Sequence, residues 1–313
     1  MRRISLVLVL AAAACHHETV SPPSNQAASR PSAAADALAF LPVDADIVLG
    51  VDVASLRTSA VWAEYQGKLT NLVGPQLASI QKSCGFDPIQ AVQSVTLGVF
   101  SKDTANTVVI VRGLDRDRTI ACLKTNVIPD TTVAMDRDVV SLIHKTGDRD
   151  VLAFADGSTL VLQGSKQPTA DGLRALVQGG APLRGSASFL EMFDRLDRGA
   201  TGWIVVNGNA SMFDKLAGMG NRPRAIYGTV RVGAGVAAKV HIRMATPEAA
   251  KQLAATAQAQ SQQAAAMFDR LDVVAEGDIM TVTIELSLEK LRSLVSMMMM
   301  MAGAQSSPPS PSP

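Results

Sequence analysis

The chain is poor in aromatic residues, histidine and cysteine, and its charges nearly cancel. Of its 313 residues, 4% are aromatic, 4 are histidine and 3 are cysteine, while 29 Lys and Arg oppose 28 Asp and Glu. Nucleic-acid-binding proteins carry a basic excess that displaces counterions, so this balance predicts that no nucleic acid is a partner. Hydrophobic residues reach 47%, which predicts a folded core built from aliphatic side chains.

Common catalytic and metal-binding motifs are also missing. The sequence contains no P-loop, HExxH, GxSxG or EF-hand pattern and no Cys-x-x-Cys pair. Residues Gly233 to Ala238 match the GxGxxA nucleotide fingerprint. Alternating residues on both sides predict a hairpin there, whereas phosphate binding needs a strand-to-helix turn. We therefore expect no cofactor, no metal site and no enzymatic activity.

The first fourteen residues have the organisation of a secretory signal peptide. Arg2 and Arg3 form a positive region, and an apolar run from Ile4 to Ala14 follows and ends at Cys15. A membrane-spanning helix needs about 20 apolar residues, so this shorter run predicts a signal peptide over residues 1–14 that is cleaved. An ordinary leader of this kind would leave Cys15 as a free thiol.

The residues before Cys15 favour a second outcome. Ala12 to Ala14 followed by Cys15 resembles the lipobox of bacterial lipoproteins, which implies that the Cys15 thiol is diacylated. Two acyl chains hold a protein stably at a membrane. His16 in place of Asp resembles the signal that sorts lipoproteins to the outer membrane. We expect a protein lipid-anchored in the cell envelope, in the outer membrane facing the periplasm, with the membrane as partner through Cys15.

Both ends of the mature chain are predicted to be disordered. Residues 15–37 are polar and rich in Pro, Ser and Ala, which predicts a tether after the lipidated cysteine. Residues 303–313 have a similar composition. Between them, the LPVDA segment from Leu41 to Ala45 resembles the opening of many uncharacterised secreted lipoproteins of Gram-negative bacteria, myxobacteria especially. This resemblance implies no activity, and we expect a non-catalytic module that binds or organises an envelope protein.

The order of predicted elements occurs twice between residues 38 and 302, which we interpret as an internal duplication into units 38–180 and 181–302. Period-two alternation predicts antiparallel sheets half-covered by helices, so the fold class is α+β. The spacing of apolar residues also predicts a helix from Pro247 to about Arg270. The matched features are the strand ends Arg112 and Arg243, the helix N-caps Asp115 and Thr246, Gly-Asp turns at 147–148 and 277–278, and Leu-Arg-x-Leu-Val segments from Leu173 and Leu291.

Two cysteines lie inside the predicted folded body. Cys84 ends a predicted helix with Gly85 as its C-cap, and Cys122 lies in the helix that Asp115 caps. An exported compartment permits a disulfide between them, and closing this loop would contribute about 4 kcal/mol on the chain-entropy model. Two buried thiols are the alternative, because the second unit has Leu253 in the place of Cys122.

One strand carries a candidate binding patch. Lys239, His241 and Arg243 alternate along it, and Arg231 lies across the predicted hairpin. These four residues are a candidate site for an anionic ligand. A solvated polar face without a ligand is the alternative.

Two further functions stay open. A hydrolase would use His144 or His241 with an acid such as Asp148 or Glu285. A copper-handling protein would use Met297 to Met301, although successive helical residues fan out by about 100° and only some of these thioethers converge. The simpler interpretation of this run is an apolar helix end that is buried or pressed against a partner or membrane.

Overall fold

A computed structural model describes residues 37–305 apart from positions 101–105, 126–127, 129, 166, 180–181 and 215–221. The predicted signal peptide, Cys15, the tether to residue 36 and the end of the tail lie outside the described residues. Side chains are likewise not described at 69–77, 79 and 299–305.

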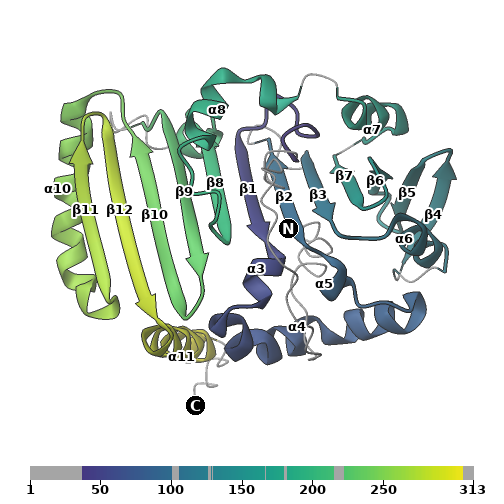
Figure 1. The fold of residues 1–313 in the computed structure, drawn as a ribbon, viewed down its shortest axis with the longest axis horizontal. Coiled ribbons are helices and arrows are strands. Elements are labelled where there is room, and N and C mark those ends of the chain that lie inside the picture. Colours follow the sequence, from purple (N-terminus) through teal and green to yellow (C-terminus); the bar gives the residue numbers. More distant parts are fainter. Residues whose placement is uncertain are drawn as a thin grey trace, which may run out of the picture.

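The chain forms one 12-stranded antiparallel sheet in the order β11-β12-β10-β9-β8-β1-β2-β3-β7-β6-β5-β4 (Figure 1). β1 and β8 pair next to its centre and join the two halves of the sheet, so strands from the beginning and the middle of the chain form this seam. At this seam Trp203 on β8 covers Gly50 on β1, where a Cβ atom would lie 2.3 Å from the indole Nε1. The strands are β1 Ile47–Asp52, β2 Ser94–Val99, β3 Thr107–Arg112, β4 Thr131–Asp136, β5 Val139–His144, β6 Arg149–Phe154, β7 Thr159–Gly164, β8 Gly202–Asn207, β9 Ala225–Val232, β10 Gly235–Arg243, β11 Arg270–Glu276 and β12 Ile279–Ser287.

The described helices begin at the polar caps that the sequence provides. Asp115 accepts a hydrogen bond from the Arg118 N–H, and Thr246 accepts one from the Ala249 N–H, as local capping rules predict. Gly85 ends α4 in the left-handed conformation, with φ of 69°. The helices are α3 Val53–Arg57, α4 Ala60–Cys84, α5 Pro88–Ala91, α6 Arg116–Leu123, α7 Ala170–Val177, α8 Ala187–Phe193, α10 Pro247–Ala264 and α11 Leu288–Gln305.

The two faces of the sheet are covered by different elements. The first, which we call the α8 face, presents Ile110, Val205 and Tyr227 to a core that includes α7, α8 and the N-terminal segment from Ala37. The second, which we call the α10 face, packs against α5 and the end of α6 over β2–β7, and against α10 over β10–β12. Alternation along each strand therefore places the described core in two layers.

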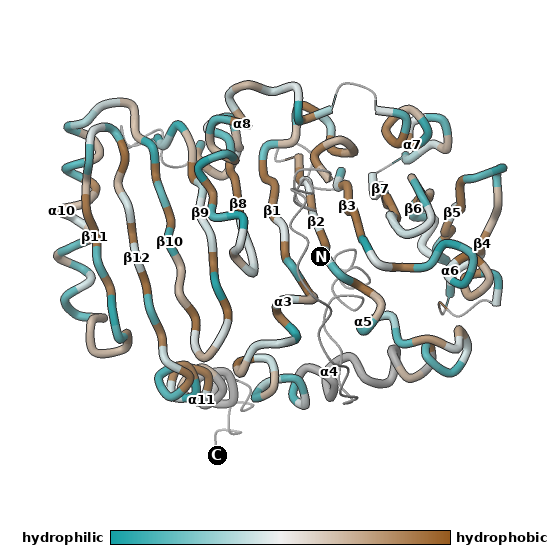
Figure 2. The backbone as a smooth tube through the Cα atoms, viewed as in Figure 1, coloured by the Kyte–Doolittle hydropathy of each residue, from teal (hydrophilic) through white to brown (hydrophobic). Residues whose placement is uncertain are grey.

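Burial is uneven along the sheet. In β1–β3 and β5–β7, side chains on both faces reach almost complete burial, as Val48 and Val108 show at 0% exposure on the α8 face and Val140 at 1% on the α10 face, whereas edge strand β4 is largely exposed. Over β11 and β12 the core on the α10 face contains Val273 and Met280, and the α8 face turns outward, with Val274 58% exposed. Figure 2 shows the same contrast as apolar central strands beside β10–β12, where apolar and polar residues alternate.

Helices α4 and α11 lie along one end of the strands (Figure 1). Arg292 of α11 makes two 2.8 Å hydrogen bonds to the carboxylate of Glu64 in α4, which joins elements from the two ends of the sequence. Among the described residues, no helix has both the length and the apolarity that crossing a membrane would require.

The α+β class with antiparallel strands is confirmed, and the two predicted units share one sheet. The internal duplication stays a prediction. The strand after the first Gly-Asp turn, β6, lies two places from β3, whereas the strand after the second, β12, pairs directly with β10. The helix predicted to reach Arg270 ends at Ala264, because Arg270 already begins edge strand β11 and Leu271 pairs there with Ile284.

Candidate functional site

The open region of the sheet is the α8 face of strands β9, β10, β12 and β11. Antiparallel register places polar side chains from all four strands on this face, which α10 does not cover. Lys239, Arg231 and Arg270 are exposed on it. We call this surface the open face; its side chains are Thr229 and Arg231 of β9, Lys239 and His241 of β10, Thr281, Thr283 and Glu285 of β12, and Arg270, Asp272 and Val274 of β11.

Both arginines of the predicted anion patch have carboxylate partners. Arg231 donates from Nε to Asp197 over 2.6 Å. Arg243 is only 19% exposed and donates to Glu191 of α8 over 2.8 Å, which lowers the pKa of Glu191 and raises that of Arg243. These ion pairs tie the α8 region to β9 and β10, so neither guanidinium is an uncompensated charge.

The other two predicted patch residues differ from the arginines. Lys239 is exposed and makes no ion pair with any residue that the structure describes. His241 lies half-buried beside it, with Nδ1 3.0 Å from Thr281 Oγ1 and its ring stacked on Tyr227 at a centroid distance of 4.9 Å. Burial is the main cause that lowers the pKa of His241, and the charges of Lys239 and Arg195 lower it further.

A second polar cluster lies on the α10 face near edge strand β4. His144 Nε2 is 2.9 Å from Asp150 Oδ2, and His144 Nδ1 is 3.1 Å from Thr131 Oγ1. The three side chains come from the adjacent strands β4, β5 and β6. The cluster therefore joins a hydroxyl, an imidazole and a carboxylate in one hydrogen-bonded row.

The acids expected to serve the histidines lie elsewhere. Asp148 occupies the turn before β6, where its backbone carbonyl accepts from the His144 N–H and its carboxylate accepts from Thr146. Glu285 contacts Arg270 at 3.3 Å, beside Ala237 rather than beside His241. Sequence analysis did not identify Asp150 as the partner of His144. Asp148 and Asp150 are both spaced so that either could share a face of the sheet with His144, and only the conformation of the turn before β6 determines which of them does.

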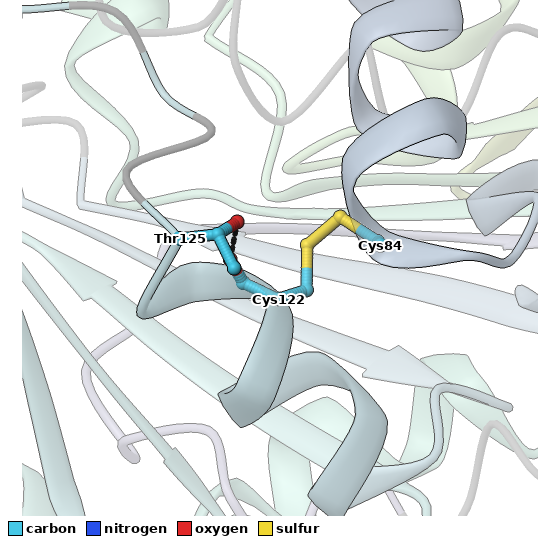
Figure 3. The surroundings of a disulfide bond; sticks show 3 residues. All are labelled: Cys84, Cys122 and Thr125. Atoms are coloured by element: carbon cyan, nitrogen blue, oxygen red, sulfur yellow. Dashed lines mark hydrogen bonds between the residues drawn. A yellow bond between two sulfur atoms is a disulfide. The ribbon is translucent and has the colours of Figure 1, made fainter.

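The disulfide between Cys84 and Cys122 is present in the structure, with a Cα–Cα distance of 4.7 Å. It joins the C-terminal end of α4 to α6 across 38 residues of sequence, as Figure 3 shows. Thr125 donates from its hydroxyl to the Cys122 carbonyl over 2.7 Å and closes the end of α6. The pairing predicted from the exported compartment is the one observed.

The methionine run lies in the last part of α11. Met297 and Met298 are exposed at 40% and 67%, and the side chains of Met299 to Met301 lie outside the described residues. No group of His, Cys, Asp or Glu that could hold a metal ion occurs among the described residues. Copper binding by the thioethers stays a prediction.

Two crystal structures resemble this fold. Crystal form IV of TP0453, from Treponema pallidum, matches with a TM-score of 0.51 at 13% identity, over 85% of this chain and 100% of that chain. Crystal form III of TP0453 gives 0.49 and 11%, over 83% of this chain and 97% of that chain. No protein-family model and no curated protein sequence matches the chain. At this identity the likeness to crystal form IV shows a shared fold.

Proposed function

We propose that this protein is a non-catalytic, lipid-anchored binding protein of the bacterial envelope, held by acylated Cys15, and that the open face is its binding surface. The observation that carries the binding role is the difference between the two faces of β10–β12. Helix α10 covers one face, with Ala254 buried against Val273, while the other presents exposed polar side chains around Val274. Solvent-facing sheet surfaces on a rigid scaffold are suited to recognising a partner.

The anchor supplies the second half of the proposal. The tether predicted over residues 15–37 separates Cys15 from the folded body, and the structure moves its end back by one residue, because Ala37 is already buried in the core beside Leu38. Such a linker lets the open face approach a neighbour in the outer membrane or the periplasm. We expect the partner to be another envelope protein.

Two measurements test the anchor and the surface separately. Cells fed a palmitate analogue should label the wild-type protein and not a Cys15→Ser variant; an unlabelled wild type overturns the anchor. A photoreactive residue at Val274, on the open face, should crosslink to a discrete envelope component. The same residue at Gln260, exposed on α10, serves as the matched control. Equal crosslinking from both positions, or none from Val274, overturns the binding surface.

The row of Thr131, His144 and Asp150 favours a hydrolase as the second candidate function. In such an enzyme Asp150 would orient His144 through Nε2, and Nδ1 would accept the proton of the Thr131 hydroxyl as that oxygen attacks an ester carbonyl. The ester C–O bond would then break as His144 returns the proton to the departing alcohol, and water, deprotonated by His144 in turn, would release the acid from Thr131. Hydrolysis of a chromogenic ester that disappears in both Thr131→Val and His144→Gln, with folding retained, would establish this activity. A rate that is unchanged in Thr131→Val would exclude it.

A further inference from the structure

The two edges of the sheet differ in how their outward backbone groups are covered. β11 forms one edge and β4 forms the other (Figure 1). At β11 the strand register turns the Val273 carbonyl away from β12, and Gln258 of α10 donates to it from Nε2 over 2.8 Å. Arg270, Asp272 and Glu276 add charged side chains along the same strand. Covering and charging an edge strand are devices that keep other chains from pairing with it.

The other edge, β4, leaves its outward backbone groups unpaired. Just before this strand the Lys145 N–H donates to the Asp130 carbonyl over 2.9 Å, so in the same register the even-numbered residues of β4 bond to β5. The N–H and C=O groups of Val133 and Met135 therefore point away from the sheet, and none of the described residues bonds to them. The strand has the sequence TTVAMD, without Lys, Arg or Pro. This edge is therefore a template for one more strand.

The side chains of β4 are also incompletely covered. On the α10 face Val133 is only partly buried against the core, and Met135, opposite the buried Val140, is 42% exposed. On the α8 face Thr132 and Ala134 are small and exposed. Side chains of a strand paired with β4 would lie directly beside these residues. Apolar residues opposite Val133 and Met135 would therefore extend the core of the α10 face outward.

The turn at the end of β4 carries an acidic excess. Arg137 and Arg174 form its ion pairs, and three carboxylates, those of Asp136, Asp138 and Asp171, share these two guanidinium groups. The Asp136 side chain at the end of the strand is 53% exposed. A basic residue opposite Asp136 would balance the charge of this turn, because opposite charges across a strand pair are stabilising.

A second copy of this chain matches the edge less well. In the antiparallel pairing that overlaps two β4 strands completely, Val133 would lie opposite Val133 of the other copy. Asp136 would then lie opposite Asp130, once at each end of the pair. Like charges directly opposite each other destabilise a strand pair. The edge therefore favours a strand from a different polypeptide.

We propose that edge strand β4 is a docking site for an extended segment of another protein, which adds to the sheet as a further antiparallel strand. The segment places apolar residues opposite Val133 and Met135, small polar residues between them, and a basic residue opposite Asp136. Main-chain hydrogen bonds to Val133 and Met135 supply the affinity, and the alternating side chains supply the specificity. This docking site is separate from the open face, because β4 and β11 are the opposite edges of the sheet.

The probe is a fluorescently labelled peptide with blocked ends, Lys-Val-Thr-Val-Thr-Val-Thr, added to the full chain in detergent and followed by fluorescence anisotropy. Paired antiparallel with β4, its lysine lies opposite Asp136 and its central valine opposite Val133. We expect saturable binding and slower amide hydrogen exchange at Val133 and Met135 in the complex. N-methylation of the central valine removes the donor to the Val133 carbonyl and should weaken binding roughly tenfold. Equal binding of the two peptides, or no saturable binding, overturns the docking site.

Proline variants at the two edges locate the binding. Met135→Pro removes an N–H that points away from β5, so the ladder with β5 is kept and peptide binding should fall roughly tenfold. Met135→Thr keeps this N–H and should bind the peptide nearly as the wild type does. The matched control is Ala275→Pro, which removes an outward N–H from edge strand β11 and should leave binding unchanged. Equal losses in the two proline variants overturn the assignment to β4, and the N-methylated peptide decides the matter if Met135→Pro does not fold.

Sedimentation velocity tests the alternative occupant of the edge. A wild type that sediments as a dimer, together with a Met135→Pro variant that sediments as a monomer, would assign the edge to a second copy and overturn the partner strand. Photocrosslinking from Val274 does not involve β4. Failure of the peptide to bind would therefore overturn the docking site and leave the proposed function of the open face standing.

Discussion

The half of the sheet from β1 to β7 and the half from β8 to β12 differ in how completely their two faces are buried. In the first half both faces are buried everywhere except at edge strand β4, with Ile110 at 1% exposure on the α8 face and Leu142 at 1% on the α10 face. Toward β11 in the second half only the α10 face is packed, and the other carries charges and hydroxyls. Complete burial of both faces provides stability, whereas a face left open provides a surface for recognition.

Removing the disulfide should produce the largest effect, and it tests whether the first half depends on a covalent link. In the double variant Cys84→Ala, Cys122→Ala we expect a loss of about 4 kcal/mol in unfolding free energy, since closing a loop of this length restricts the unfolded chain. Urea unfolding measures the loss. Reductant should destabilise the wild type to the same level and leave the double variant unchanged. A double variant as stable as the wild type would contradict this account.

Substituting one isoleucine in each half compares the packing of the two halves directly. Ile110 on β3 is 1% exposed, while Ile284 on β12 is only partly buried. We expect Ile110→Ala to cost about 3 to 4 kcal/mol and Ile284→Ala less than about 2, because the cost rises with the cavity left behind. Denaturant unfolding of both variants gives the comparison. Equal losses would show that the second half is packed as completely as the first.

Two arginines at matched places in the repeated Leu-Arg-x-Leu-Val segments sharpen the comparison further. Arg174 of α7 is 12% exposed and binds Asp136, Asp138 and Asp171, which fastens the β4–β5 turn to the helix. Arg292 is 53% exposed and binds one carboxylate. We expect Arg174→Ala to lower the urea midpoint more than Arg292→Ala does, because more charge-assisted hydrogen bonds are lost. Each Lys variant is the control for charge, and the opposite ranking would count against this explanation.

The smallest effect concerns pH and the ion pairs of the second half. Hydrogen bonding to Arg243 lowers the pKa of Glu191 below its ordinary value of 4.5. A carboxylate with a lowered folded-state pKa contributes stability above its unfolded pKa and loses that contribution as the pH falls through the folded value. Unfolding midpoints at about pH 5.5 and about pH 3.5 should therefore differ less in Glu191→Gln than in the wild type. The same pH dependence in both proteins would show that this pair is not linked to folding.

Local features of the fold were predictable from neighbouring residues. The caps Asp115, Thr246 and Gly85 act where capping rules place them, because each bonds within a few residues of itself. The hairpin at Gly233 and the alternation of Lys239 with His241 follow from the same short-range pattern. The pairing of Cys84 with Cys122 needed one further inference from the sequence, the predicted export of the chain.

The chemistry of the clusters was less predictable, since it depends on pairing between distant strands. Thr229 and Thr283 flank Lys239 only because β9 and β12 both pair with β10, from opposite sides and in one particular register. Arg231 and Arg243 do not act as free cations of the predicted anion patch, because they pair with Asp197 and Glu191. The α8 region brings these two carboxylates to the sheet. A shift of one residue in register would turn the whole set to the other face.

Sequence alone determined the aliphatic core, the polar and apolar alternation of the strands and the positions of helix ends, since these properties arise from interactions over a few residues. Tertiary structure decided which face of β10–β12 stays open, which cation there lacks a carboxylate, and which acid His144 bonds. The physical reason is that burial and ion pairing are set by neighbours in space, and a 12-stranded antiparallel sheet makes neighbours of residues far apart in the chain.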